Sequence, residues 1–204
     1  MINVAAVHVG DYCGRGAEYV QRLYEGINKH LRHVDYTAWC VTDNPSLLPK
    51  GVKPIEVDVA VNGWWNKIAL FRPGAFPVGE QVLYFDLDTI ITGDLADISE
   101  YRGKFAMLRD FYYPGHLGSG LMSWQAGWLD HIWRTWDRCG RPEFIAGGDQ
   151  TWIETVQPYT DQWQDMLPGQ VVSYKVDCLQ GIPDNARVCC FHGQPRPHEV
   201  NWLE

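Results

Sequence analysis

Clusters of basic residues are absent from this 204-residue sequence, which carries 17 lysines and arginines against 25 aspartates and glutamates. The formal net charge of −8 argues against nucleic acid and anionic membrane surfaces as main partners, because both attract basic patches. It does not exclude a small phosphorylated ligand, which needs only a few local cations or a metal ion.

Cysteine pairs of the C-x-x-C type are also missing. The six cysteines are spread along the chain, and only Cys189 and Cys190 lie close together, inside an apolar run. Zinc sites and disulfide frameworks need regularly spaced cysteines or histidines. We therefore expect reduced and mostly buried thiols.

Long apolar runs are missing as well, so we expect no membrane span. The first residues, MINVAAVHVGDYC, have no basic segment and only a short apolar patch, which is not the pattern of a signal peptide, and we expect a cytoplasmic protein. No repeat, low-complexity tract or linker divides the chain, and 46% of it is hydrophobic. This composition predicts one globular domain, residues 1–204.

Short apolar runs alternate with helical patterns along the chain. The pattern predicts strands at Ile2–Val9, Asp35–Asp43, Pro54–Val61, Val82–Phe85, Lys104–Asp110, Ser119–Trp124 and Arg187–Gly193. Helices are predicted at Ala17–Leu31, Trp64–Phe71, Gly127–Cys139 and Gly148–Val156. This alternation predicts an α/β fold with a single, mostly parallel central sheet flanked by helices.

Two aspartates, Asp86 and Asp88, follow the apolar run VLYF. Residues i and i+2 of a strand point the same way, so both carboxylates can converge on one cation. Ligands of open α/β sheets bind outside the carboxyl ends of the strands, where this pair is expected. Carboxylates suit Mg²⁺ or Mn²⁺, which proteins often share with substrate phosphates. The pair therefore predicts a divalent-metal site.

Two enzyme classes use such a pair. Haloacid-dehalogenase-type phosphatases carry four apolar residues followed by D-x-D-x-T, which VLYFDLDT matches, with Asp86 as nucleophile and Asp88 as acid. That fold has the motif on its first strand and needs a later G-D-x-x-x-D motif, whereas Ile153 stands where the last aspartate is required. Sugar-nucleotide-dependent glycosyltransferases with a GT-A fold carry D-x-D after several strands, and this position fits them better.

The order of the other motifs resembles glycosyltransferase family 8, the glycogenin-like group. The matching segments are the first strand and loop, NKIALF, LYFDLDTII, GSGLM, GGDQ and FHG-x-P-R-P, and they cover most of the chain. The resemblance implies a GT-A-type nucleotide-diphospho-sugar transferase fold. It also implies transfer of a hexose from a UDP-sugar donor to an acceptor hydroxyl, of a saccharide or another compound, with retention of anomeric configuration.

The resemblance further implies a role for each motif. Asp86, Asp88 and His192 would bind the cation, and the imidazole nitrogen favours manganese over magnesium. Asp149 would bind sugar hydroxyls and Gln150 would lie near the anomeric carbon, as the catalytic pair. Donor contacts would come from Val7, His8, Asp11, Tyr12, Lys67, Asp86, Gly118, Ser119, Gly120, Gly193 and Arg196.

Several of these residues also fit a purely structural role. Lys67 can be an exposed helix lysine, Asp149 can be a helix N-cap, and Tyr12 can be a surface residue instead of a platform for the uracil. Arg196 is expected to face the diphosphate, because a guanidinium suits phosphate oxygens. We expect Asp94 and Asp97 to be turn and helix-start residues, and the helix with Trp128, Trp133 and Trp136 to belong to the core.

Two further interpretations stay open. A sugar-nucleotide-binding module without catalysis would keep the same aspartates and histidine. A nucleotidyltransferase on a related fold would show a glycine-rich basic loop after the first strand, and GDYCGRG, with Arg15, is a poor version of one.

Overall fold

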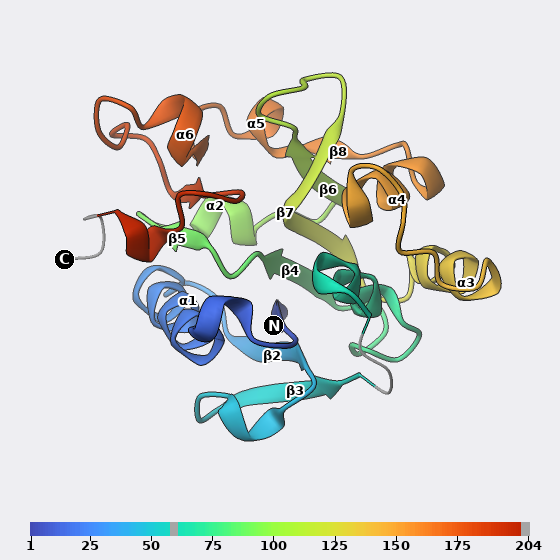
Figure 1. Ribbon diagram of the computed structural model, residues 1–204. Coiled ribbons are helices and arrows are strands. Elements are labelled where there is room, and N and C mark those ends of the chain that lie inside the picture. The colour runs from blue at the N-terminus through green and yellow to red at the C-terminus, as the bar shows by residue number, and fades with distance from the viewer. Residues whose placement is uncertain (58–60, 201–204) are drawn as a thin grey trace.

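A seven-stranded sheet forms the centre of the computed structural model, which describes residues 1–57 and 61–200 (Figure 1). Its strand order is β3-β2-β1-β4-β7-β6-β8. The first four are parallel, β7 runs antiparallel to both of its neighbours, and β8 is parallel to β6. This arrangement confirms the predicted, mostly parallel α/β sheet. The bounds are β1 Ile2–His8, β2 Tyr36–Thr42, β3 Val52–Glu56, β4 Gln81–Phe85, β6 Phe105–Arg109, β7 Leu117–Gln125 and β8 Asp161–Gln162.

A second, three-stranded sheet has the order β5-β10-β9. Strand β5 runs antiparallel to β10, and β10 is parallel to β9. The chain leaves the large sheet at the end of β4 and enters the small one at the start of β5, so Asp86 and Asp88 lie at the junction between them. The bounds are β5 Thr89–Ile91, β9 Val171–Ser173 and β10 Val188–Cys190.

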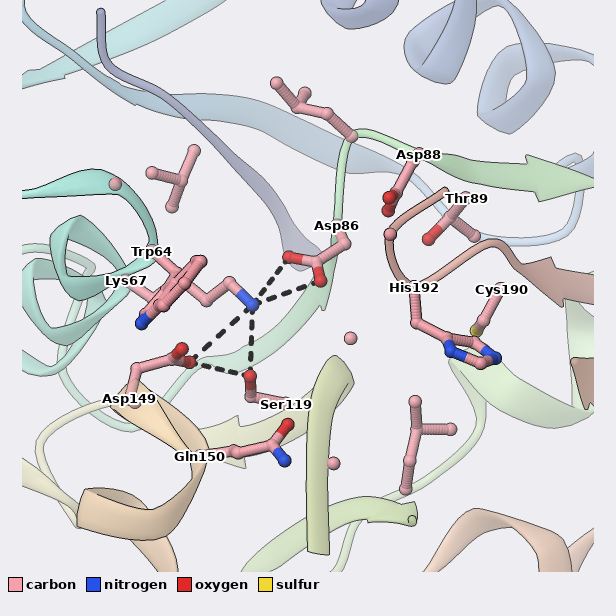
Figure 2. A pocket seen from close by; sticks show the side chains of 18 of the residues that line it. Trp64, Lys67, Asp86, Asp88, Thr89, Ser119, Asp149, Gln150, Cys190 and His192 are labelled. Atoms are coloured by element: carbon pink, nitrogen blue, oxygen red, sulfur yellow. Dashed lines mark hydrogen bonds and ion pairs between the residues drawn. The ribbon is translucent and has the colours of Figure 1, made fainter. Parts of the chain in front are cut away.

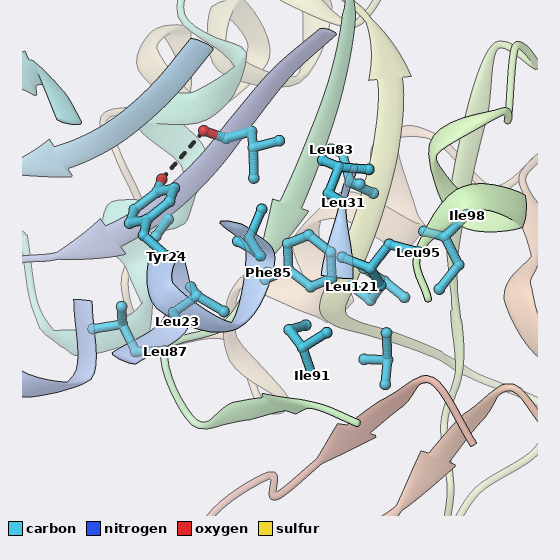
Figure 3. Close-up of a cluster of buried hydrophobic side chains, with 14 of the residues drawn as sticks. Leu23, Tyr24, Leu31, Leu83, Phe85, Leu87, Ile91, Leu95, Ile98 and Leu121 are labelled. Carbon is cyan, nitrogen blue, oxygen red and sulfur yellow. Dashed lines mark hydrogen bonds between the residues drawn. The ribbon is translucent and has the colours of Figure 1, made fainter. Parts of the chain in front are cut away.

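Helix α1 (Gly16–His30) covers one face of the large sheet. Its buried residues recur at helical spacing and pack against side chains of β4 and β5 (Figure 3). The Tyr24 hydroxyl donates to the carbonyl of Val4, at 3.2 Å, and to that of Trp39, so the helix is bonded to both β1 and β2. Helix α2 (Ala96–Ser99) starts after Asp94, whose side chain accepts the Ala96 N–H, as expected for a turn residue.

The opposite face is covered by η3 (Gly63–Phe71), a 3-10 helix, together with α3 (Asp130–Arg138) and α4 (Gly148–Val156). Aromatic rings fill this second core. Trp136 is buried there and Trp133 is partly buried, as expected, whereas Trp128 is 38% exposed.

Most element boundaries differ from the predicted ones by a few residues, for reasons of backbone conformation. The predicted helix at Gly127 begins only at Asp130, because Gly127 has a φ of 88°. The predicted strand Arg187–Gly193 ends at Cys190, since His192 and Gly193 have positive φ angles. Strand β3 ends before residues 58–60, and that part of the predicted strand lies outside the described residues.

The last third of the chain contains short elements that the sequence pattern did not predict. They are β8, β9, α5 (Trp163–Met166), α6 (Tyr174–Asp177) and the 3-10 turn η4 (Pro197–Glu199). None of the described helices has both the length and the apolarity needed to cross a bilayer. All six cysteines are free thiols and four of them are buried, which confirms the expectation from their spacing.

Candidate active site

A pocket of about 1120 Å³ opens at the carboxyl ends of β1 and β4. The chain continues from β1 to β2 on one side, while β4 lies on the other side of β1, so the strand order reverses here. Such a switch point is where open α/β sheets bind their ligands. Residues predicted from the sequence line it: Val7, Asp11, Tyr12, Lys67, Asp86, Asp88, Gly118, Ser119, Gly120, Asp149, Gln150, His192, Gly193 and Arg196.

The ammonium group of Lys67 lies at the centre of the polar contacts in this pocket (Figure 2). Its Nζ lies 2.9 Å from Asp86 Oδ1 and 3.6 Å from Asp149 Oδ2, and donates to Ser119 Oγ at 3.0 Å. The Ser119 hydroxyl in turn donates to Asp149 Oδ2 at 2.6 Å. Lys67 is only 9% exposed, so it is not a surface lysine. The buried ammonium of Lys67, from the NKIALF motif, thus contacts residues of three other motifs, which are D-x-D, GSG and GGDQ.

The local structure of η3 directs Lys67 into the pocket. Side chains three residues apart in a 3-10 helix lie over one another, so Trp64 and Lys67 share the face that lines the pocket. The start of η3 is fixed by Asn66, whose side-chain amide donates to the carbonyls of Val61 and Gly63 at 2.7 and 2.8 Å.

Burial and charge oppose each other at Lys67. Burial alone lowers the pKa of Lys67, but the nearby carboxylates of Asp149 and Asp86 raise it further, and the net pKa is well above the usual value. The ammonium therefore stays charged. For Asp149, burial raises the pKa, while Lys67 and the Ser119 hydrogen bond act in the opposite direction.

The negative charge of Asp88 is stabilised by fewer side-chain donors than that of Asp86. The Asp86 carboxylate accepts hydrogen bonds from Lys67 and from the Tyr84 hydroxyl. For Asp88, Nη1 of Arg196 lies 3.9 Å from Oδ2. Burial and the charge of Asp86 raise the pKa of Asp88 to about 6. An ionised Asp88 therefore favours an additional cation.

Oxygen atoms around this pair fit a hard divalent cation. Thr89 follows Asp88 directly, and its buried Oγ1 has no hydrogen-bond partner in the part of the chain that the structure describes. Carboxylate and hydroxyl oxygens are donors that Mg²⁺ and Mn²⁺ accept. Asp86 and Asp88 are therefore the residues that would hold a metal ion.

His192 is not turned toward these aspartates. Its Nε2 lies 2.6 Å from Ser173 Oγ, and its ring stacks on Phe111 with 5.3 Å between ring centroids. In Figure 2 the imidazole lies beside Cys190, apart from both carboxylates. Within residues 1–57 and 61–200, no three His, Cys, Asp or Glu side chains are grouped as a metal site. The predicted set of three protein ligands is therefore not assembled in this structure, because Ser173 binds the histidine instead.

The other end of the pocket is formed by the loop after β1. Asp11 Oδ2 accepts the Gly14 N–H at 2.9 Å and so closes the turn that carries Tyr12. The guanidinium carbon of Arg196 lies 4.6 Å from the centre of the Tyr12 ring. Arg196 thus lies between an aromatic face and the Asp88 carboxylate, with its side chain 24% exposed.

His8 does not line the pocket, although the sequence resemblance gave it a donor contact. Its side chain is 3% exposed and lies against the start of α1, where a Cβ on Gly16 would come 1.8 Å from His8 Nε2. Burial lowers the pKa of His8. The close approach requires glycine at position 16, and the structure places the His8 side chain at the start of α1, outside the pocket lining.

Sequence reasoning missed several residues that line the pocket, and three of them are polar or aromatic neighbours of predicted site residues. Trp64 lies three residues before Lys67, and that spacing is a usable signal once a 3-10 helix is assumed. Asp110 follows the end of β6, where its Oδ2 lies 3.4 Å from Gln150 Nε2 and its Oδ1 accepts the Tyr112 N–H at 2.8 Å. Tyr84 belongs to β4 and is hidden in an apolar run.

Comparison with solved structures finds glycosyltransferases with the same fold. An active-site mutant of LgtC aligns over 100% of this chain and 91% of its own, with a TM-score of 0.70 at 8% identity. The glycosyltransferase GlyE of Streptococcus pneumoniae aligns with a TM-score of 0.69 at 15% identity, over 97% of this chain and 56% of its own. The bifunctional glycosyltransferase WbbM aligns with a TM-score of 0.69 at 11% identity, over 96% of this chain and 46% of its own.

The chain has a GT-A-type glycosyltransferase fold. It spans little more than half the length of the GlyE chain and less than half of the WbbM chain. No protein-family model and no curated protein matches the sequence. The fold confirms the GT-A prediction, and membership in family 8 stays a prediction.

Proposed function

We propose that this chain is a metal-dependent glycosyltransferase that moves a hexose from a UDP-sugar to an acceptor hydroxyl and retains the anomeric configuration. The observation that carries the proposal is the contact of Lys67 with Asp86, Ser119 and Asp149 in one pocket. Four motifs that resemble family 8 in sequence thus meet at the position where sheets of this kind bind ligands.

In the proposed reaction the bond between the anomeric carbon and the diphosphate oxygen breaks, and a bond to the acceptor oxygen forms. The acceptor proton passes to the leaving diphosphate. Negative charge develops on that leaving group, so fixed cations near it lower the barrier. Arg196, held between Tyr12 and Asp88, is the side chain proposed to bind the diphosphate. A divalent ion on Asp86 and Asp88 would supply Lewis-acid stabilisation of the same charge.

The donor sugar is assigned to the Asp149 end of the pocket. Lys67 and Ser119 both contact Oδ2 of Asp149, which fixes this carboxylate as an acceptor for sugar hydroxyls. A carboxylate held in this way is a poor nucleophile, which supports front-face attack by the acceptor over a covalent intermediate. Gln150, beside Asp149, is proposed to lie near the anomeric carbon.

The nucleoside is assigned to the loop after β1, with Tyr12 and Asp11 as its neighbours. LgtC, which has this fold at 11% identity over 96% of the present chain, is a galactosyltransferase crystallised with donor and acceptor sugar analogues. The likeness supports a saccharide donor here.

The proposal is tested by donor turnover. The protein is incubated with UDP-glucose, UDP-galactose or GDP-mannose, with Mn²⁺ or with chelator, and free nucleoside diphosphate is measured. Release of UDP that requires Mn²⁺ is the expected result. Binding of the donor without release under any condition would favour the alternative of a sugar-nucleotide-binding module. Phosphate release from phosphomonoesters, with none from nucleotide sugars, would instead favour the phosphatase.

A further inference from the structure

Trp64 lines the pocket with 60% of its surface exposed. In the described part of the chain every other tryptophan is less exposed, and the next is Trp128 at 38%. A large aromatic ring that is exposed inside a pocket offers a flat apolar face that a ligand can cover. The reaction proposed above gives this residue no role.

The indole of Trp64 is held in place from one side. Its Nε1 lies 2.2 Å from the point where a Cβ on Gly148 would stand, and Gly147 and Gly148 both have positive φ angles, 83° and 68°. Only glycine permits both this backbone and this approach. The ring therefore rests on the turn that starts α4, directly before Asp149, while the rest of it faces the pocket.

A second aromatic side chain comes from the loop between β6 and β7. Tyr112 is 55% exposed and also lines the pocket. Asp110 connects it to the proposed catalytic end, because Oδ1 accepts the Tyr112 N–H at 2.8 Å and Oδ2 lies 3.4 Å from Gln150 Nε2. The Tyr112 ring itself packs edge-on against His192, with 5.3 Å between ring centroids, whereas Trp64 lies beside Lys67 and Asp149 (Figure 2).

The pocket is large. Its volume of about 1120 Å³ lies just above the roughly 300–1000 Å³ that is usual for ligand pockets. A donor placed along Tyr12, Arg196 and Asp149 leaves the part beside Trp64 for a second substrate (Figure 2).

We propose that Trp64 is the stacking platform of an acceptor subsite and that the acceptor is a saccharide whose pyranose ring lies on the indole. This inference rests on the proposed transferase function. A pyranose presents C–H groups on its face and hydroxyls around its edge. The indole matches the face, and Asp110 and Gln150 offer polar partners for the edge. A serine or threonine hydroxyl on a peptide has no such face.

The test uses methyl glycosides of glucose, galactose and mannose as acceptor probes. Saturation-transfer NMR with UDP and diamagnetic Mg²⁺ reports their binding. Initial rates with UDP-glucose or UDP-galactose as donor and Mn²⁺ give KM and kcat. Trp64→Ala is expected to raise the KM of the bound glycoside about tenfold, with a smaller change in kcat, whereas Trp64→Phe gives an intermediate KM. Trp128→Ala, at an exposed tryptophan outside the pocket, is the matched control and keeps the wild-type KM.

Equal glycoside binding by the wild type and Trp64→Ala would overturn the inference. So would glycosylation of a serine- or threonine-containing peptide without glycosylation of any methyl glycoside. Calorimetric titration with UDP is made on every variant. A wild type that does not bind UDP contradicts the transferase function itself, whereas UDP binding without an effect of Trp64 contradicts only the acceptor subsite.

Discussion

Lys67 Nζ lies 3.6 Å from Asp149 Oδ2, inside a pocket where both residues are less than a tenth exposed. The pair brings together the helix before β4 and the start of α4, two segments far apart in the sequence. Because Asp86 shares the same ammonium, two carboxylates depend on one cation. The charge balance of the site therefore depends first on Lys67.

Lys67→Met is expected to lower the free energy of unfolding by about 3 kcal/mol, since it leaves the buried Asp149 and the partly buried Asp86 without their cation. Chemical denaturation at neutral pH measures the change. The double variant Lys67→Met, Asp149→Asn should recover part of the lost free energy of unfolding, because it removes one unpaired charge. Lys50→Met, at an exposed lysine outside the active-site pocket, serves as control. Equal losses in the two lysine variants would contradict the account.

Asp88→Asn is expected to stabilise the ligand-free protein at about pH 7.5. The pKa of Asp88 is raised to about 6, above that of the unfolded chain, so its contribution to stability falls as pH rises from about 4 to above 6. The ionised group then costs on the order of 3 kcal/mol, and asparagine removes that cost. Thermal unfolding with chelator measures it. A gain that is no larger at about pH 7.5 than at about pH 4 would contradict this reasoning.

His8 should make the protein acid-sensitive. Burial lowers the pKa of His8, so below its usual value of 6.5 the unfolded chain takes up a proton that the folded protein does not. Stability is thus full above about pH 6.5 and falls as pH drops toward the folded pKa. His8→Gln should flatten this part of the stability curve, measured by urea unfolding at several pH values. An unchanged slope would show that His8 is not the responsible group.

Ser173→Ala should strengthen Mn²⁺ binding in the presence of UDP. The Ser173 hydroxyl bonds His192 Nε2, and a histidine released from this bond becomes available as a third metal ligand. A hydrogen bond of ordinary strength corresponds to a gain of about fivefold in affinity. Calorimetric titration with Mn²⁺ measures it, and His192→Ala should abolish the gain. If Ser173→Ala and the double variant Ser173→Ala, His192→Ala both bind Mn²⁺ with wild-type affinity, His192 is not a metal ligand.

The strands and the aspartate pair could be predicted because local pattern determines them. The short apolar run VLYF predicts a buried strand from local sequence alone, and Asp86 follows directly after the end of that strand. The glycines at 118 and 120 and the GGDQ turn were predicted through the order of short motifs, which needs little overall sequence similarity.

Contacts between distant segments could not be predicted. The bond between Ser173 and His192 depends on the pairing of β9 with β10, and β9 is a three-residue strand without a sequence signal. The burial of Lys67 likewise depends on how η3 packs against α4. The position of the His8 side chain could not be predicted either, because its packing against Gly16 at the start of α1 depends on how the helix lies on the sheet.

The most direct test of the central claim is calorimetric titration of UDP into the metal-free protein, with and without Mn²⁺, for the wild type, Asp88→Ala and Asp184→Ala. Asp184 is an exposed carboxylate outside the pocket and serves as the matched control. The account predicts that UDP binds the wild type and Asp184→Ala only with Mn²⁺, and that Asp88→Ala loses this binding. Absence of UDP binding by the wild type with either Mn²⁺ or Mg²⁺ would contradict the account.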